Sequence, residues 1–169
     1  QHRIYLTSYL RKQIESRQLQ VPTQQGRIYR IVHNSRARQP ESLPAKPTSE
    51  QLVARLNHPN GWWRDRAQQM LVERRDLEVV PALRKLSADS GVLPTARLHA
   101  LWTLDGMGQI DISTLAKSID DASPKVRSAT IRLAEQFLQS EDRDDAVNLV
   151  LRRAGFVPLE EQLQLILTL

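Results

Sequence analysis

From residue 48 onward, hydrophobic positions recur at the three- and four-residue spacing of helices, in short segments interrupted by proline, glycine or aspartate. Thr48 and Gln51 are three residues apart and match a capping box, so we expect a helix to start there. Ser123 followed by Pro124 predicts another start, with serine as the cap and proline at the first helical position. We expect helices over the ranges 49–56, 62–74, 78–89, 94–106, 112–121, 124–138, 143–155 and 159–169.

Three of these helices align on a shared arginine, and the alignment reveals a repeat. Arg64, Arg97 and Arg127 are 33 and 30 residues apart, and Glu161 takes the same position 34 residues later. Small or β-branched residues follow three positions later, and apolar residues seven positions later: Ala67, Ala100, Thr130, Leu71, Leu104 and Ala134. Helix pairs that repeat every 30–34 residues are typical of an α-solenoid. The pattern resembles HEAT and bilin-lyase-type repeats, so we predict an all-α, HEAT-like α-α superhelix of antiparallel helix pairs; a general helical bundle is the alternative.

The first part of the chain has a different pattern. "TSYLRKQIESR" predicts a short helix with Thr7 or Ser8 as its N-cap. "GRIYRIV" at 26–32 has the composition of a β-strand, for which "RIYL" at 3–6 is a possible partner. We therefore divide the chain into a short helix with a strand or hairpin remnant, a proline-rich linker and a helical repeat domain: 1–35, 36–47 and 48–169.

Composition limits the chemistry. The chain has no cysteine, which excludes disulfides, thiolate metal sites, cysteine nucleophiles and haem attachment through C-x-x-C-H. The net charge of +5 is compatible with a nucleic acid or an acidic partner, but the charges are interspersed, which favours a solvated arginine-rich surface. No apolar run reaches about 18 residues, so we expect no membrane span. The chain begins at Gln1 rather than Met, so we expect it to be processed or cut from something longer.

The stretch "HPNGWWRDRAQQML" at 58–71 is the most distinctive one, because it contains two of the three tryptophans. Trp63 aligns with Ala96 and Val126 in the repeat, so we predict a core role for it. Trp62 has no counterpart in the other helices. We expect it to cap the end of the repeat stack or to meet a neighbouring domain. A stacking platform for a ligand or base is the alternative.

The recurrent arginines have two interpretations. Arginines at repeat positions usually form a ladder of partly buried ion pairs between repeats, here with acids such as Asp65, Asp105 or Asp121. The alternative is a basic groove that binds phosphate. Trp62, Arg64, Asp65, Arg97 and Arg127 are therefore the candidate interaction residues. No catalytic, cofactor-binding or metal-ligating residue is predicted, since no H-x-x-x-H, G-x-S-x-G or nucleophile–base pattern occurs.

The combination of segments resembles one family of large bacterial secreted proteins. The segments are "QHRIYLTSYLRKQIESRQL", "GRIYRIV", a proline-rich spacer, "LVARLNHPNGWWRDRAQQMLVER", "VVPALRKL" and "ARLHALWTLDGMG". These proteins join a β-propeller similar to quinoprotein-like glucose/sorbosone dehydrogenases to a HEAT-like domain and, in many cases, a c-type cytochrome domain. They are often called membrane-bound dehydrogenase-domain or PVC-type haem-binding proteins. The resemblance covers most of residues 1–138.

The resemblance implies a function for the fragment. Residues 1–35 would be the tail of the propeller and 48–169 a non-catalytic HEAT-like scaffold, without a cofactor of its own. Its partners would be the propeller and cytochrome domains of the same chain, or another protein. The parent would be periplasmic or secreted and would carry haem c and a quinone. The alternative is a nucleic-acid-binding module of the alkylbase-glycosylase type; the residues that supply this chemistry are Trp62, Trp63, Arg64, Asp65 and Trp102. A chromophore lyase or carrier is a third reading.

Overall fold

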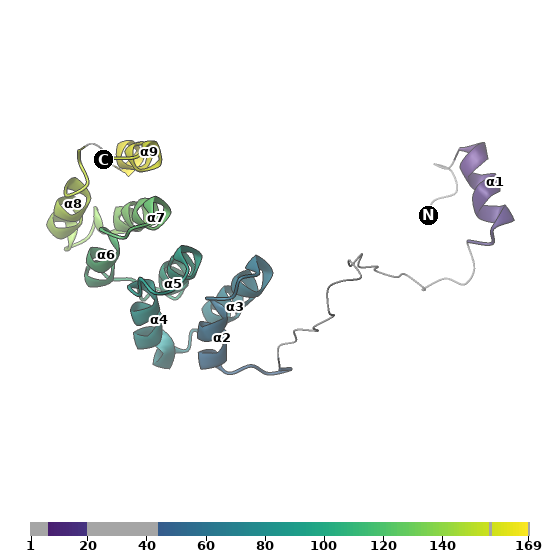
Figure 1. The fold of residues 1–169 in the computed structure, drawn as a ribbon, viewed down its shortest axis with the longest axis horizontal. Coiled ribbons are helices and arrows are strands. Elements are labelled where there is room, and N and C mark those ends of the chain that lie inside the picture. The colour runs from purple at the N-terminus through teal and green to yellow at the C-terminus, as the bar shows by residue number, and fades with distance from the viewer. Residues whose placement is uncertain (1–6, 20–43, 156, 169) are drawn as a thin grey trace. The chain divides into compact units, whose positions relative to one another are not determined.

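The computed structural model describes residues 7–19, 44–155 and 157–168, and these residues form helices and loops without a strand. The chain divides into two compact units, residues 1–42 and 43–169 (Figure 1). In the first unit, helix α1 (Ser8–Ser16) follows Thr7, whose side chain accepts a hydrogen bond from the backbone N–H of Leu10. Thr7 is therefore the cap. The expected strand at 26–32 and its partner at 3–6 lie outside the described residues.

The second unit has the predicted helical order. Among its described residues the helices are α2 (Ser49–Arg55), α3 (Gly61–Arg74), α4 (Val80–Ser87), α5 (Pro94–Gly106), α6 (Ile112–Ser118), α7 (Pro124–Ala134), α8 (Arg143–Leu151) and α9 (Leu159–Thr168). Two 3₁₀ turns, η2 (Leu77–Val79) and η3 (Glu135–Phe137), precede α4 and extend α7. The all-α fold class is thus confirmed for the part of the chain that the structure describes.

Local side chains explain where the helices begin. The backbone N–H of Gln51 donates to Thr48 Oγ1 at 3.3 Å, and the N–H of Thr48 donates to Gln51 Oε1 at 3.0 Å, so the predicted capping box is present. The Ser123 prediction is only half correct. Pro124 occupies the first turn of α7, but the Ser123 hydroxyl makes no cap hydrogen bond. Instead, Asp121 Oδ1 accepts the Ser123 N–H at 2.7 Å and shapes the turn.

The helices of the second unit lie in two rows (Figure 1). Helices α3, α5, α7 and α9 pack successively against one another and form the inner row of the bend. Helices α2, α4, α6 and α8 form the outer row, and α2, α4 and α6 pack against α3, α5 and α7. The connections within each pair are short, as required for antiparallel neighbours.

The repeat alignment correctly identifies the buried positions. All six residues placed three and seven positions after the shared arginine are fully buried: Ala67, Ala100, Thr130, Leu71, Leu104 and Ala134. Two hydrophobic clusters continue this core, one over α2–α5 and one over α5–α9. The periodicity that predicts the helices therefore also predicts which faces pack together.

Gly106 is the last residue of α5, as expected for a helix end, but it also has a packing role. A Cβ at this position would lie 2.8 Å from Cγ2 of Val72 on α3, so the close approach of α5 to α3 requires glycine. The turn that follows uses Gly108, which has a φ of +69°.

Candidate functional site

The three repeat arginines share one local geometry. Each donates hydrogen bonds through Nη1 to backbone carbonyls of the turn that precedes its own helix. For Arg64 the acceptors are the carbonyls of His58 and Pro59, at 2.6 and 2.9 Å. For Arg97 the nearest acceptor is Val92, at 2.6 Å. The arginine thus satisfies carbonyls that would otherwise lack partners at the turn, and this explains why it recurs with the repeat.

Arg97 also reaches the next helix pair. Its Nε and Nη2 donate to Oδ2 and Oδ1 of Asp121 at 2.7 and 2.9 Å, a bidentate ion pair. The two side chains are 5% and 9% exposed, so solvent screens the pair little. Asp121 lies in the turn before α7, and the pair therefore joins α5 to the next repeat. The ladder prediction is confirmed for Arg97 and Asp121.

Arg127 makes the corresponding bridge to α9. Its Nε donates to Oε1 of Glu161 at 2.9 Å, its Nη2 bonds the same oxygen, and Arg153 donates to Oε2 at 3.2 Å. Glu161 is fully buried. Burial opposes its ionisation, but the hydrogen bond and charge of Arg127, aided by Arg153, hold the pKa of Glu161 below its ordinary value. The repeat alignment located Glu161 but did not predict its pairing with Arg127.

Two of the expected acids have other partners. The Asp65 side chain is 76% exposed and lies 3.7 Å from Nε2 of His99 on α5. The Asp105 carboxylate accepts a hydrogen bond from Nε2 of Gln136 at 3.0 Å. Of the three alternative acids, Asp121 is therefore the one that pairs with a repeat arginine, because Asp65 and Asp105 face a neighbouring helix of the inner row. We use "ladder" below for Arg64, Arg97 and Arg127 with the acids Asp121 and Glu161.

His99 joins α3 to α5. Its Nδ1 lies 2.6 Å from Oε1 of Gln68, and only 18% of its side chain is exposed. Burial and the positive charge of Arg64 lower the pKa of His99, against the opposite effect of Asp65. The imidazole is therefore neutral at neutral pH and acts as a packing and hydrogen-bonding group between two helices.

Trp63 is not a core residue, contrary to the prediction. It is only partly buried, whereas the aligned Ala96 and Val126 are fully buried. The guanidinium of Arg55 lies over its ring, 4.8 Å from the centroid, and Trp62 packs edge-on against it at 4.6 Å between centroids. The physical reason is position, since α3 begins the inner row and no described helix of this unit precedes its pair. The Trp62 side chain is 60% exposed.

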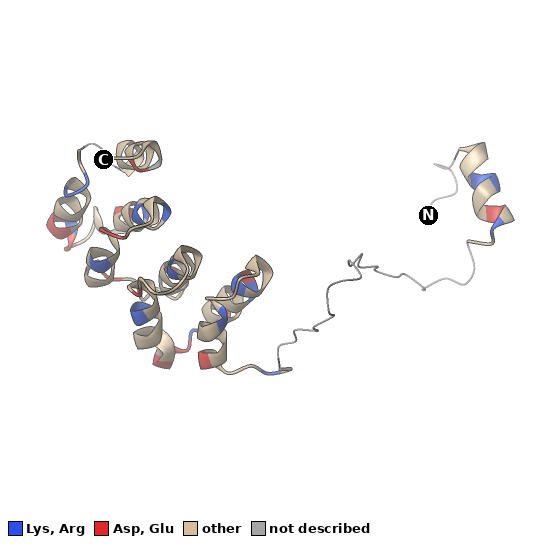
Figure 2. Ribbon diagram, in the orientation of Figure 1, with Lys and Arg blue, Asp and Glu red and all other residues tan. Residues whose placement is uncertain are grey.

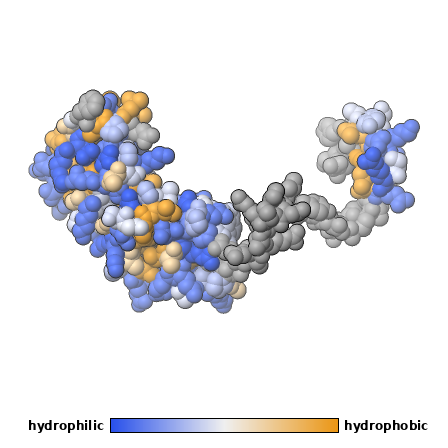
Figure 3. Space-filling view, viewed as in Figure 1, coloured by the Kyte–Doolittle hydropathy of each residue, from blue (hydrophilic) through white to orange (hydrophobic). Residues whose placement is uncertain are grey.

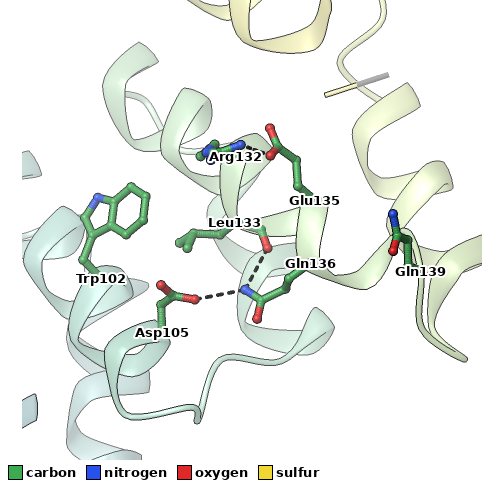
Figure 4. Close-up of a pocket in the computed structure, with 7 residues that line it drawn as sticks. All are labelled: Trp102, Asp105, Arg132, Leu133, Glu135, Gln136 and Gln139. Carbon is green, nitrogen blue, oxygen red and sulfur yellow. Dashed lines mark hydrogen bonds and ion pairs between the residues drawn. The ribbon is translucent and has the colours of Figure 1, made fainter. Parts of the chain in front are cut away.

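A hollow of about 470 Å³ opens between α5 and α7 on the inner row (Figure 4). Its lining residues are Trp102, Asp105, Arg132, Leu133, Glu135, Gln136 and Gln139. Arg132 is paired with Glu135, and Gln136 bridges to Asp105. The Trp102 ring is 36% exposed at the edge of the hollow. One indole beside several fixed donors and acceptors can hold an extended polypeptide, with the ring covering an apolar side chain and the polar groups bonding its backbone.

A second hollow, of about 660 Å³, lies on the outer row. It is lined by Pro81, Arg84, Lys85, Ala88, Asp89 and Lys117. Arg84 is paired with Asp111 at 2.6 Å, which neutralises part of its positive charge. Charges of both signs are interspersed over the helices of this unit and do not form a block of one sign (Figure 2).

The structure places Trp62, Arg64 and Asp65 on α3, Arg97 on α5 and Arg127 on α7, outside both hollows. Within the described ranges, no group of three or more His, Cys, Asp or Glu residues has the arrangement of a metal site. None of the helices described is both long and apolar enough to cross a membrane. Searches of family models, of curated proteins and of solved structures gave no match to this chain.

Proposed function

We propose that residues 43–169 form a non-catalytic helical-repeat scaffold that binds a protein segment on its inner row. The observation that supports this most directly is the hollow beside Trp102. Its polar groups are already oriented by hydrogen bonds, as Gln136 is by Asp105. Oriented polar groups around an exposed aromatic ring favour an ordered polypeptide ligand.

The contacts of the recurrent arginines support a scaffold rather than an enzyme. Arg97 and Arg127 bond acids and turn carbonyls, and these contacts hold successive repeats together. A general base or nucleophile needs a partner within hydrogen-bond reach and access to substrate. His99 has a lowered pKa and a side chain that is 18% exposed, between two helices.

The wider setting is also a proposal, and it rests on the family resemblance. The scaffold would connect a dehydrogenase-like propeller, whose tail is 1–35, to a c-type cytochrome domain in a periplasmic or secreted electron-transfer protein. Haem c and a quinone would belong to those domains. The coding sequence on both sides of this chain tests the setting directly: we expect propeller blades upstream and a C-x-x-C-H motif downstream. Finding neither would rule this setting out.

The scaffold proposal has two binding tests. Titration of the whole chain with haem or a soluble quinone should show no saturable binding, and saturable binding would contradict the proposal. Titration with the flanking domains should show binding that Trp102→Ala weakens about tenfold or more, the effect of a central aromatic contact. Leu77→Ala is the matched control and should bind like the unaltered chain, because Leu77 is exposed and lies outside the hollow.

No observation favours the nucleic-acid alternative. The guanidinium groups of Arg97 and Arg127 are used by acids and carbonyls, and Arg64 bonds the carbonyls before α3. A phosphate would have to compete with these contacts. Duplex DNA at low salt is the direct test: affinity that falls steeply with salt would favour the alternative, and we expect none.

A further inference from the structure

The hollow beside Trp102 carries one negative charge that is not balanced by a neighbouring cation. The charged residues that line it are Asp105, Arg132 and Glu135. Arg132 forms an ion pair with Glu135, so these two charges offset each other. Asp105 accepts a hydrogen bond from the neutral amide of Gln136, and no described residue forms an ion pair with its carboxylate. The hollow is therefore locally acidic, although the chain as a whole has a net charge of +5.

The unbalanced carboxylate lies beside the exposed indole. Trp102 and Asp105 are three residues apart on α5, and this spacing makes their side chains neighbours on the helix surface. Figure 4 shows both side chains on the same side of the hollow, with Gln136 next to Asp105. Gln136 bonds Oδ1 of Asp105, which leaves Oδ2 without a hydrogen-bond donor among the described residues. An aromatic surface and a carboxylate acceptor are thus available together.

We propose that the hollow takes a lysine or arginine side chain of the bound polypeptide, with its aliphatic stem on the Trp102 ring and its cationic head at the Asp105 carboxylate. This inference rests on the proposed function, in which the inner row binds a protein segment. Cations are attracted to the face of an aromatic ring, and tryptophan attracts them most strongly. Lysine and arginine also cover apolar surface with their stems while their charged heads stay at polar groups.

Other side chains fit the same pair of groups less well. An aliphatic side chain would cover the indole but would leave the Asp105 carboxylate partly desolvated and without a cation, which costs free energy. A glutamate or aspartate would bring a second negative charge next to Asp105. A cation on an aliphatic stem is therefore the ligand group that uses both the ring and the carboxylate.

The surface of the unit also favours a ligand group with a polar end. Hydrophilic residues cover most of the second unit on the face shown in Figure 3, with smaller hydrophobic patches among them. In the hollow itself, Gln136 and Gln139 add uncharged polar groups to the acidic and basic ones. A wholly apolar ligand would bury these groups without hydrogen bonds, which is unfavourable.

Peptide binding tests the charge preference. The probe is a pool of blocked octapeptides with lysine fixed at one central position and uncharged residues mixed at the others; matched pools carry arginine, norleucine or glutamate there. The whole chain, labelled with nitrogen-15, reports binding through the indole N–H signal of Trp102, which is assigned by its absence in Trp102→Phe. We expect the lysine and arginine pools to bind about fivefold tighter than the norleucine pool or more, and the glutamate pool to bind weakest.

Two variants separate the carboxylate from the ring. Asp105→Asn removes the charge but keeps an oxygen that accepts from Gln136, so the preference for lysine over norleucine should fall to about twofold or less. Trp102→Leu keeps an apolar surface without an aromatic face, so it should also reduce this preference; backbone amide signals of the hollow report its binding. Asp145→Asn is the matched control, because Asp145 is an exposed aspartate on α8, outside the hollow. It should keep the full preference, and all three variants should keep the helical circular dichroism spectrum.

The outcomes distinguish this inference from the proposed function. Equal binding of the lysine and norleucine pools to the unaltered chain would overturn the inference alone, because a polypeptide would still bind in the hollow. Tighter binding of the glutamate pool, or a lysine preference that survives Asp105→Asn, would overturn it as well. Absence of binding for all four pools would contradict both the inference and the proposed binding of a protein segment.

Discussion

The first and last arginines of the ladder lie in different surroundings. Arg64 bonds only backbone carbonyls among its described hydrogen bonds, and its helix faces outward with exposed polar groups and Trp62. Arg127 bonds a fully buried carboxylate, and α9, which supplies this carboxylate, exposes four aliphatic side chains on its other face: Leu159, Leu163, Ile166 and Leu167. The same sequence position therefore fixes a turn at one end and joins two repeats at the other. Because the acceptor of Arg127 is a buried charge, we expect Arg127 to contribute more to the unfolding free energy than Arg64 does.

The largest effect is expected at Arg127. Arg127→Met leaves the buried Glu161 with Arg153 as its remaining cation, and breaking a buried ion pair costs about 3 kcal/mol or more. Urea denaturation followed by circular dichroism, at fixed protein concentration, measures the loss of unfolding free energy. Adding Glu161→Leu to Arg127→Met removes the stranded charge and should recover most of that loss. A single-variant loss below about 1 kcal/mol would show that the pair is not structurally important.

Acid should weaken the contact between α7 and α9. The folded state lowers the pKa of Glu161, so its stabilising contribution is fully present above the ordinary value of 4.5 and is lost as the pH falls through the folded pKa. Unfolding free energy measured from pH 7 downward should fall in this window. Glu161→Gln should be less stable at pH 7 and should show a shallower decline. An equally steep decline in this variant would assign the acid sensitivity to other groups.

Arg64→Met should cost about 1 kcal/mol, the effect of losing one part-buried and one exposed hydrogen bond to carbonyls. This value is about a third of the Arg127 effect, because no buried acid is left behind. The same urea titration gives both values. Equal losses of unfolding free energy for Arg64→Met and Arg127→Met would mean that the buried acid beside Arg127 adds nothing to its contribution.

The smallest effect is expected at Trp62. Because its side chain is 60% exposed, Trp62→Ala should change unfolding free energy by about 0.5 kcal/mol or less. Both variants lose the contact between the two rings, but Trp63→Ala should cost more because Trp63 is partly buried and also packs against the Arg55 guanidinium. A larger loss of unfolding free energy for Trp62→Ala than for Trp63→Ala would show that Trp62, not Trp63, is the ring that stabilises the fold.

Local signals in the sequence predicted the helices well. Helix α5 spans the predicted 94–106, because Pro94 starts it and glycine follows closely at its end. The predicted α6 and α8 are three and four residues too long at their C-terminal ends, because the spacing of apolar residues does not mark the residue at which a helix ends. The buried positions followed from the repeat alignment, which depends on the same periodicity.

The partners of the charged residues were harder to predict. Asp121 was among the expected acids, but Glu161 was not, because its contact spans 34 residues and depends on how α9 is rotated against α7. The prediction for Trp63 is wrong because the alignment assumes equal burial in every repeat, whereas α3 is the first helix of the inner row and, among the described residues, lacks the neighbour that covers Ala96 and Val126. The hollow at Trp102 combines residues from α5, α7 and η3, and no motif in the sequence indicates it.

The central claim is that the ion pairs of Arg97 and Arg127 hold successive repeats together. A double-mutant cycle on Arg97 and Asp121 tests it most directly, with Arg97→Met, Asp121→Ala and the combined variant measured by urea denaturation. Because both side chains are almost fully buried and bonded twice, we predict a coupling energy of about 2 kcal/mol or more. A coupling energy below about 0.5 kcal/mol would contradict the ladder, because it would show that the two residues stabilise the fold independently of each other.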